Sequence, residues 1–283
     1  MTFSIVARSP DGETFGVAVA SKFLAVGAAV PAAESGVGAV ATQAWANLQY
    51  RPDGLRLLRE GRAAADVLDA LTAGDEGRAE RQAGVVARTG DGATYTGPEC
   101  MSWAGGRAGD GYAVQGNILT GPGVVEAMEL AWLDSTGEPH PRRLLAALAA
   151  GDAAGGDRRG RQSAALLVVT PDGGYGGGSD VLVDLRVDDH PAPVGELARL
   201  LDLHRLYFER PDPADCVELS GDVAGEVRAR LAGLGFSASG ADPDALDAAL
   251  ADWAGMANLE ERLVAGRIDP LVLEQLRAAE PAG

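Results

Sequence analysis

The residues with the clearest capacity for chemistry stand at the start of the sequence. Residue 2 is Thr, and an initiator Met before a small residue is normally removed, so we expect a mature chain that begins with Thr2. Such a residue carries a hydroxyl nucleophile and a free α-amine together. The α-amine has a reference pKa of about 7.7 to 8.0, so it can accept a proton near pH 7. A Thr activated by its own amine is a known nucleophile arrangement, although Met-Thr is also a common start without catalytic meaning.

Two polar residues are expected beside Thr2. Residues 3–20 read as a β-hairpin, because an Asp-Gly pair between two apolar runs favours a tight turn. A turn centred on that pair places Thr2 opposite Ser21 and next to Lys22. Lys22 is the only lysine of the sequence, every other strongly basic residue being Arg. A compact ammonium has roles that Arg cannot fill, so we predict that Ser21 and Lys22 belong to the catalytic group; the alternative for Lys22 is a strand end that faces water.

Two further polar stretches have residue types that bind ligands. Arg158 and Arg159 lie in a glycine-rich polar loop, residues 155–161, and are candidates to hold a substrate carboxylate; the alternative is a loop whose charges face water. Residues 184–190 hold three Asp and one His, which suit several divalent ions. Such a run is more typical of a solvated strand end, so we predict neither a metal nor a cofactor.

Composition restricts the class of protein. The 283 residues include 24 Lys and Arg against 41 Asp and Glu, a formal charge of -17, which argues against nucleic acid and anionic membranes as partners. The two cysteines, Cys100 and Cys216, form neither a metal-like spacing nor a disulfide framework. No apolar run is long enough to span a membrane and no signal peptide is recognisable, so we expect a cytoplasmic protein. Monomer and homo-oligomer both remain open.

The elements that must position these residues alternate between groups of strands and pairs of helices. Helical spacing of apolar residues appears in two pairs, each between groups of short apolar runs. Two sheets packed face to face with helices outside satisfy this order, whereas a doubly wound parallel sheet needs regular strand-helix alternation. The runs expected as strands after the hairpin cover residues 26–33, 37–42, 82–88, 93–96, 112–119, 163–169 and 181–187.

The composition changes near Arg210. The segment RPDPADCVEL contains two prolines and reads as a linker. Three short amphipathic patterns follow it, which predict a small helical domain. We therefore predict two domains, residues 1–210 and 211–283.

Five segments in the expected order carry a resemblance to a known family: TFSIVAR, GVAVASKF, GVGAVATQA, YAVQGNIL and GGDRRGRQSAALLV. They resemble a widespread uncharacterised bacterial family that is grouped with the N-terminal-nucleophile (Ntn) hydrolases, the proteasome-like superfamily. The resemblance covers roughly residues 2–208. It implies an α+β protein with an αββα four-layer sandwich and an N-terminal Thr at a sheet edge. The C-terminal part resembles, more weakly, a peptidoglycan-binding domain.

The resemblance also implies roles for particular residues. Thr2 fits the superfamily nucleophile. Proteasome-type members use a Lys on the third strand, which is absent from residues 26–33. Either Lys22 supplies the positive charge from another strand, or the amine works without it. The oxyanion hole often uses backbone N–H groups after the fourth strand, which correspond to Thr42, Gln43 and the residue after them. Asn117 is a second candidate donor, with a structural strand-end amide as the alternative.

These observations predict an Ntn-type amidohydrolase that cleaves a small or peptide-like amide through an acyl-enzyme on Thr2. The alternative is a non-catalytic binding protein whose cleft and C-terminal module hold a ligand or partner. Removal of Met1 discriminates between them, because a retained Met acylates the amine that the mechanism needs.

Overall fold

The computed structural model of this protein describes residues 2–238 and 242–280. Two compact units divide the chain, Met1–Leu200 and Leu201–Gly283. The division falls inside α6 (Pro193–Phe208), whereas the predicted domains 1–210 and 211–283 place the boundary after this helix. The predicted boundary stays a prediction.

The first unit contains a six-stranded sheet in the order β10-β9-β2-β1-β8-β7. Every neighbouring pair in it is antiparallel. β1 and β2 form the predicted hairpin, and they are buried along nearly their whole length because the sheet is covered on both faces. The strands of this sheet are β1 (Thr2–Arg8), β2 (Phe15–Ser21), β7 (Gly105–Gly109), β8 (Tyr112–Asn117), β9 (Ser163–Val169) and β10 (Val181–Val187).

A four-stranded antiparallel sheet in the order β3-β4-β5-β6 faces the first one. β1 and β2 contact β4, and side chains such as Val17, Val19 and Ala41 pack in one apolar cluster between the sheets. Removing this surface from water is the main force that holds the sheets together. The strands of the second sheet are β3 (Pro31–Glu34), β4 (Gly38–Ala44), β5 (Arg81–Ala87) and β6 (Ala93–Thr96).

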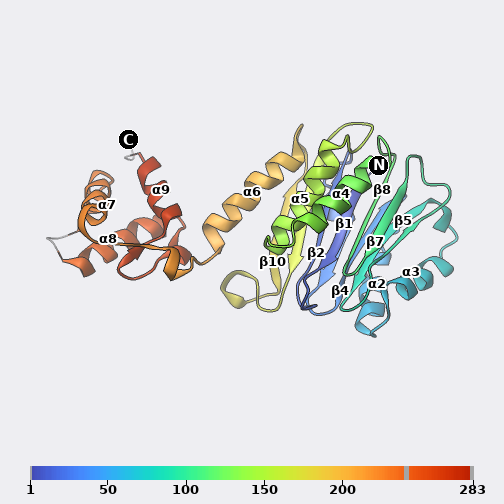
Figure 1. Ribbon diagram of the computed structural model, residues 1–283, viewed down its shortest axis with the longest axis horizontal. Coiled ribbons are helices and arrows are strands. Elements are labelled where there is room, and N and C mark those ends of the chain that lie inside the picture. The colour runs from blue at the N-terminus through green and yellow to red at the C-terminus, as the bar shows by residue number, and fades with distance from the viewer. Residues whose placement is uncertain (1, 239–241, 281–283) are drawn as a thin grey trace. The chain divides into compact units, whose positions relative to one another are not determined.

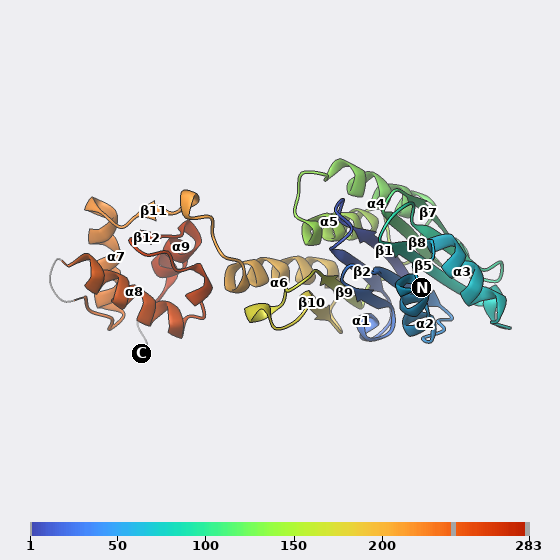
Figure 2. The same ribbon diagram turned by 90° about the horizontal axis from the view of Figure 1, so that it is seen from below.

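Two pairs of helices cover the outer faces of the sheets, as Figures 1 and 2 show. α4 (Gly123–Asp134) and α5 (His140–Ala153) contact the six-stranded sheet. α2 (Tyr50–Arg59) and α3 (Ala64–Ala73) contact the four-stranded sheet. The predicted mixture of α and β structure is therefore confirmed.

Two local predictions differ from the structure. The expected strand over residues 26–33 is wrong at its start, where the chain forms the short helix α1 (Val26–Ala29) before β3. Ala25 adopts a left-handed φ of 52°, and Ser163 Oγ accepts a hydrogen bond from the Val26 N–H at 3.1 Å, so the chain turns away from the first sheet here. β7 was missed because its sequence, GGRAG, is poor in the β-branched residues that indicate a strand.

The second unit contains the predicted helical patterns as α7 (Gly221–Gly233), α8 (Pro243–Met256) and α9 (Pro270–Ala278). Their apolar faces share one core with the end of α6, including Val227 and Trp253. Figure 2 shows a short two-stranded sheet beside these helices, β11 (Val217–Glu218) with β12 (Arg267–Ile268), which the sequence did not predict.

The remaining elements of the two units are single 3₁₀ turns, η1 (Arg78–Glu80), η2 (Tyr175–Gly177), η3 (Pro213–Asp215) and η4 (Glu260–Arg262).

A half-buried histidine begins α5. Both ring nitrogens of His140 are buried without a hydrogen-bond partner, and its ring packs edge-on against Trp132 at a centroid distance of 5.6 Å. Burial, aided by the positive charge of Arg143, lowers the pKa of His140 to about 4. Arg143 in turn lies 3.8 Å from the centre of the Trp132 ring. Protonation of His140 would therefore place a second, unpaired charge in this cluster.

We expect His140 to make the first unit sensitive to acid. Its folded pKa lies below the unfolded value near 6.5, so its contribution to stability is complete above about pH 6.5 and is lost as the pH falls towards 4. The full difference corresponds to about 3 kcal/mol. Urea unfolding of His140→Phe should show a smaller loss of stability across this window than the wild type. The exposed His190, changed to Phe, is the matched control, and equal pH dependence in all three proteins would contradict this explanation.

Candidate functional site

Thr2 lies at the end of the central strand of the six-stranded sheet. Its two neighbours across the strands are Ser21 of β2 and Asn117 of β8. The Thr2 Oγ1 atom is 3.1 Å from Ser21 Oγ, and Thr2 is 6% exposed. The predicted pairing of Thr2 with Ser21 is confirmed, because the Asp-Gly turn sets the register of the hairpin.

Strained backbone gathers around this end of the sandwich. Of the five non-glycine residues with positive φ in the described part of the chain, three lie at or within four residues of strand ends there. Ala25 follows β2 at 52°, Ala44 ends β4 at 67°, and Ile118 follows β8 at 50°. A β-branched residue such as Ile118 rarely adopts this conformation. Strain of this kind is often concentrated at functional sites, so these positions support a site at Thr2.

A buried network of amide side chains connects the two sheets behind Thr2. Gln82 Oε1 accepts hydrogen bonds from Gln43 Nε2 at 2.8 Å and from Asn117 Nδ2 at 2.9 Å. The Gln43 amide also donates to the Thr2 carbonyl at 3.4 Å, and its oxygen accepts from the Ser4 hydroxyl at 2.7 Å. Polar groups in such an interior are expensive unless they are paired. The network therefore fixes the position of the Thr2 backbone.

Three members of this network were missed by the sequence predictions: Ser4, Gln82 and Gln115. Gln115 Nε2 donates to Ser4 Oγ at 2.7 Å, and Gln82 Nε2 donates to the Gly116 carbonyl at 2.7 Å. A Cβ atom at Gly84 would lie 2.1 Å from Gln115 Oε1, so this glycine makes room for the amide. The sequence did contain a signal for these residues, because each is a polar residue within a mostly apolar strand, β1, β5 or β8.

Thr42 lies near the end of β4 and donates hydrogen bonds to two backbone carbonyls. Its hydroxyl donates to the Asn47 carbonyl at 3.1 Å and its N–H donates to the Val30 carbonyl at 3.2 Å, while the residue is completely buried. These contacts hold the loop that follows β4, and a role of Thr42 in binding the oxyanion or the substrate stays a prediction.

Lys22 follows the predicted strand end but is exposed to solvent. Its ammonium donates to the carbonyl of Arg161 at 3.3 Å, and its backbone N–H donates to Asp157 Oδ2 at 2.7 Å. Asp157 is buried and was missed by the sequence predictions. A role of the Lys22 ammonium at Thr2 stays a prediction, whereas its backbone contact fixes the loop beside the site.

The structure brings the loop of Arg158 and Arg159 to the same edge as Thr2. The Arg158 N–H donates to the Ile118 carbonyl at 3.3 Å, next to the Asn117 that pairs with Thr2. The Arg159 N–H donates to Asp157 Oδ1 at 2.8 Å, and its guanidinium lies 3.3 Å from Asp157 Oδ2. Both side chains are exposed. Binding of a substrate carboxylate by these residues stays a prediction.

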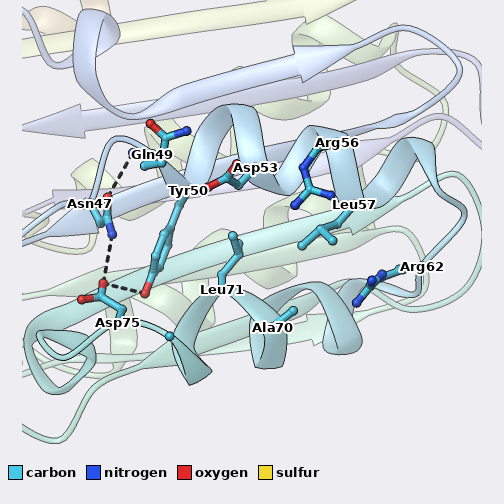
Figure 3. A pocket seen from close by; sticks show the side chains of 11 residues that line it. Asn47, Gln49, Tyr50, Asp53, Arg56, Leu57, Arg62, Ala70, Leu71 and Asp75 are labelled. Atoms are coloured by element: carbon cyan, nitrogen blue, oxygen red, sulfur yellow. Dashed lines mark hydrogen bonds between the residues drawn. The ribbon is translucent and has the colours of Figure 1, made fainter.

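A separate cleft of about 470 Å³ opens between α2 and α3 on the outer face (Figure 3). At one end Asp75 accepts hydrogen bonds from Tyr50 OH at 2.9 Å and Asn47 Nδ2 at 3.1 Å, and it pairs with Arg81 at 2.9 Å. Arg81 holds the pKa of Asp75 well below its usual range, and burial raises the pKa of Tyr50. Because Arg81 also donates to the Trp45 carbonyl at 2.6 Å, this cluster fixes the loop after β4.

The acidic stretch considered as a metal site is engaged in other contacts. Asp184 pairs with Arg186 at 2.9 Å, and His190 Nδ1 accepts a hydrogen bond from the Ala192 N–H at 3.0 Å. Within residues 2–238 and 242–280, no group of three His, Cys, Asp or Glu is arranged to hold a metal ion.

Burial raises the pKa of the thiols of Cys100 and Cys216, which disfavours the reactive thiolate.

Comparison with known proteins identifies a family for the first unit. Residues 2–197 match the model of a family described as "Family of unknown function (DUF1028)". The chain belongs to this family. The DUF1028 chain is also 32% identical to protein SPO2555 from Silicibacter pomeroyi, whose crystal structure matches with a TM-score of 0.65 over 80% of this chain and 92% of that one.

The second unit gave a separate match. Residues 207–276 match the family described as "Putative peptidoglycan binding domain". No curated protein matched the DUF1028 chain. Among the described helices, none is both long and apolar enough to cross a membrane.

Proposed function

We propose that this DUF1028 protein is an Ntn amidohydrolase that cleaves a small or peptide-like amide with Thr2 as the nucleophile. The proposal includes the assignment of the first unit to the αββα sandwich of the Ntn superfamily. The observation that carries it is the position of Thr2, a hydroxyl residue at the head of a central strand with Ser21 Oγ at 3.1 Å. The strained strand ends around Thr2 support the same site.

In the proposed mechanism Met1 is removed and the α-amine of Thr2 acts as the base. The amine takes the hydroxyl proton, and Thr2 Oγ1 attacks the amide carbon. The C–N bond then breaks, and the leaving amine takes the proton that the α-amine holds. Water gives a proton to the same amine and adds to the acyl ester; the C–O bond to Thr2 Oγ1 then breaks, Thr2 Oγ1 takes the proton back, and the acid leaves. Ser21 supports the reaction by orienting the Thr2 hydroxyl.

Stabilisation of the oxyanion is assigned to amide donors near Thr2. An amide NH₂ group has two hydrogens, and Asn117 Nδ2 gives one of them to Gln82. We assign the second hydrogen of Asn117 Nδ2 to the oxyanion. The resemblance implies a further donor, a backbone N–H near Gln43. A single oxyanion donor of this kind contributes about 10²- to 10³-fold to the rate.

A catalytic contribution of Lys22 has a direct test. If its positive charge favours the neutral amine of Thr2, Lys22→Met should slow the reaction of Thr2 with a β-lactone. Because the side chain is exposed, the free energy of unfolding should change by less than about 0.5 kcal/mol. The two quantities are measured by adduct mass against time and by urea unfolding. An unchanged reaction rate would remove Lys22 from the catalytic group.

A non-catalytic binding protein is the second candidate function. It is favoured by the match of residues 207–276 to a binding domain. In this case the first unit would present its Thr2 edge as a ligand site without turnover.

The experiment that tests the proposal is covalent labelling. A β-lactone should acylate the purified protein once, and peptide mapping should locate the added mass on Thr2. Labelling at another residue, or none while Met1 is absent, would contradict the proposed function.

A further inference from the structure

Large apolar side chains are exposed at the same edge of the sandwich as Thr2. Phe23 and Leu24 follow β2, two and three residues after the Ser21 that pairs with Thr2. Trp45, 72% exposed, follows β4 two residues after Gln43, whose amide reaches the Thr2 carbonyl. Exposed apolar side chains that gather in one region indicate a binding surface.

Two more residues extend this group. Leu48 lies in the same loop as Trp45. The carbonyl of Met101 accepts a hydrogen bond from the Ile118 N–H at 2.9 Å. Ile118 directly follows the Asn117 that pairs with Thr2. We call the five exposed side chains the apolar rim, which consists of Phe23, Leu24, Trp45, Leu48 and Met101.

A basic segment borders the apolar rim, although the chain has a formal charge of -17. Lys22, Arg158, Arg159 and Arg161 are exposed here. Asp157 pairs with Arg159 and Asp152 pairs with Arg161, which leaves Lys22 and Arg158 without an ion pair among the described residues. Local positive charge on an acidic protein favours an anionic group of the ligand.

We propose that the Thr2 edge binds an N-acylated amino acid, with its apolar acyl group on the apolar rim and its free carboxylate on Arg158. A guanidinium is suited to carboxylate recognition, and the amide bond between the two groups then lies at Thr2. The inference deepens the proposed function and rests on it for cleavage. Thr2 Oγ1 forms an ester with the acyl carbon as the C–N bond of the ligand breaks, and the amino acid leaves with the Thr2 proton on its nitrogen. Water then breaks the ester bond, which releases the fatty acid and restores the Thr2 hydroxyl.

Binding is tested apart from cleavage in the full-length Thr2→Ala variant, by calorimetry with three probes below their micelle concentrations. N-decanoylglycine should bind at least about tenfold more tightly than N-acetylglycine, which lacks the apolar chain, and N-decanoylethanolamine, which lacks the carboxylate. Trp45→Ala should remove the preference for the long chain. Arg158→Ala should remove the preference for the carboxylate.

Matched controls are available at the opposite end of the sandwich. Tyr175, 70% exposed, lies in the segment that joins β9 to β10, and Arg88 pairs with Glu13 in the turn between β1 and β2. Tyr175→Ala and Arg88→Ala should leave the affinity for N-decanoylglycine unchanged. Equal affinity for the three probes, or equal losses in the controls, would overturn the inference.

Two other outcomes are informative. A dimer that Trp45→Ala dissociates, in a protein that does not bind N-decanoylglycine, would assign the apolar rim to contact between two copies of this chain and overturn the inference. Tight binding of N-decanoylglycine to Thr2→Ala, together with no β-lactone adduct on the wild type, would support the ligand site while contradicting the proposed catalysis. The failure of the ligand class and the failure of the catalytic proposal are therefore distinguishable.

Discussion

Replacing Thr2 with Ala should lower the rate of β-lactone labelling by about 10³-fold or more, because the attacking oxygen is removed. The fold should remain, since Thr2 contributes one hydroxyl contact to Ser21 and little apolar packing. Loss of such a hydrogen bond costs about 1 kcal/mol. The two effects are measured by mass spectrometry over time and by urea unfolding of the first unit.

Two companion variants separate the groups of Thr2. Thr2→Ser keeps a hydroxyl and a removable Met, so it should retain measurable labelling. A Glu inserted between Met1 and Thr2 keeps the hydroxyl but blocks the amine, and it should abolish labelling. Full reactivity of the insertion variant would show that another residue is the base, and full reactivity of Thr2→Ala would remove Thr2 from the site.

Replacing Arg262 with Met should destabilise the second unit by about 3 to 5 kcal/mol, because it leaves a buried charge without its partner. Arg262 and Asp269 form an ion pair in which their side chains are only 5% and 4% exposed. Arg262 Nη1 also donates to the carbonyls of Arg205 at 2.8 Å and Glu209 at 2.7 Å at the end of α6. A loss of this size is comparable with the whole stability of a unit of this length.

The measurement is calorimetric unfolding of the full chain. The transition of the second unit should move to lower temperature or disappear in Arg262→Met, while that of the first unit stays in place. Arg210→Met is the matched control, since Arg210 pairs with Glu261 at the surface and such pairs contribute about 0 to 1 kcal/mol. Equal small effects of the two variants would show that the buried pair adds little to stability.

The parts of the fold that local physics determines could be predicted from the sequence. The Asp-Gly turn sets the hairpin register, and this alone places Thr2 opposite Ser21. Helical spacing of apolar residues predicted two pairs of helices, and α3 shows why: Val67, Leu68 and Leu71 face the four-stranded sheet, and Gly74 follows its last residue. These features depend on neighbours in sequence, so one sequence contains enough information to predict them.

The rest of the site depends on contacts between distant segments. Gln82 and Asn117 are 35 residues apart, and Asp157 is 135 residues from the Lys22 N–H that it holds. No periodic pattern indicates that such residues meet. The short helix α1 could not be predicted from the local sequence either. Residues 26–33 are apolar and partly β-branched, which favours a strand, whereas the hydrogen bond from the Val26 N–H to Ser163 of β9 helps to start the helix.

The most direct test of an N-terminal nucleophile is the intact mass of the purified protein before and after incubation with a β-lactone. We expect the mass of a chain that begins at Thr2, without Met1, and one added acyl group after incubation. A protein that keeps Met1 and still gains the acyl group at the same rate would contradict the proposal, because its α-amine would no longer be available as the base.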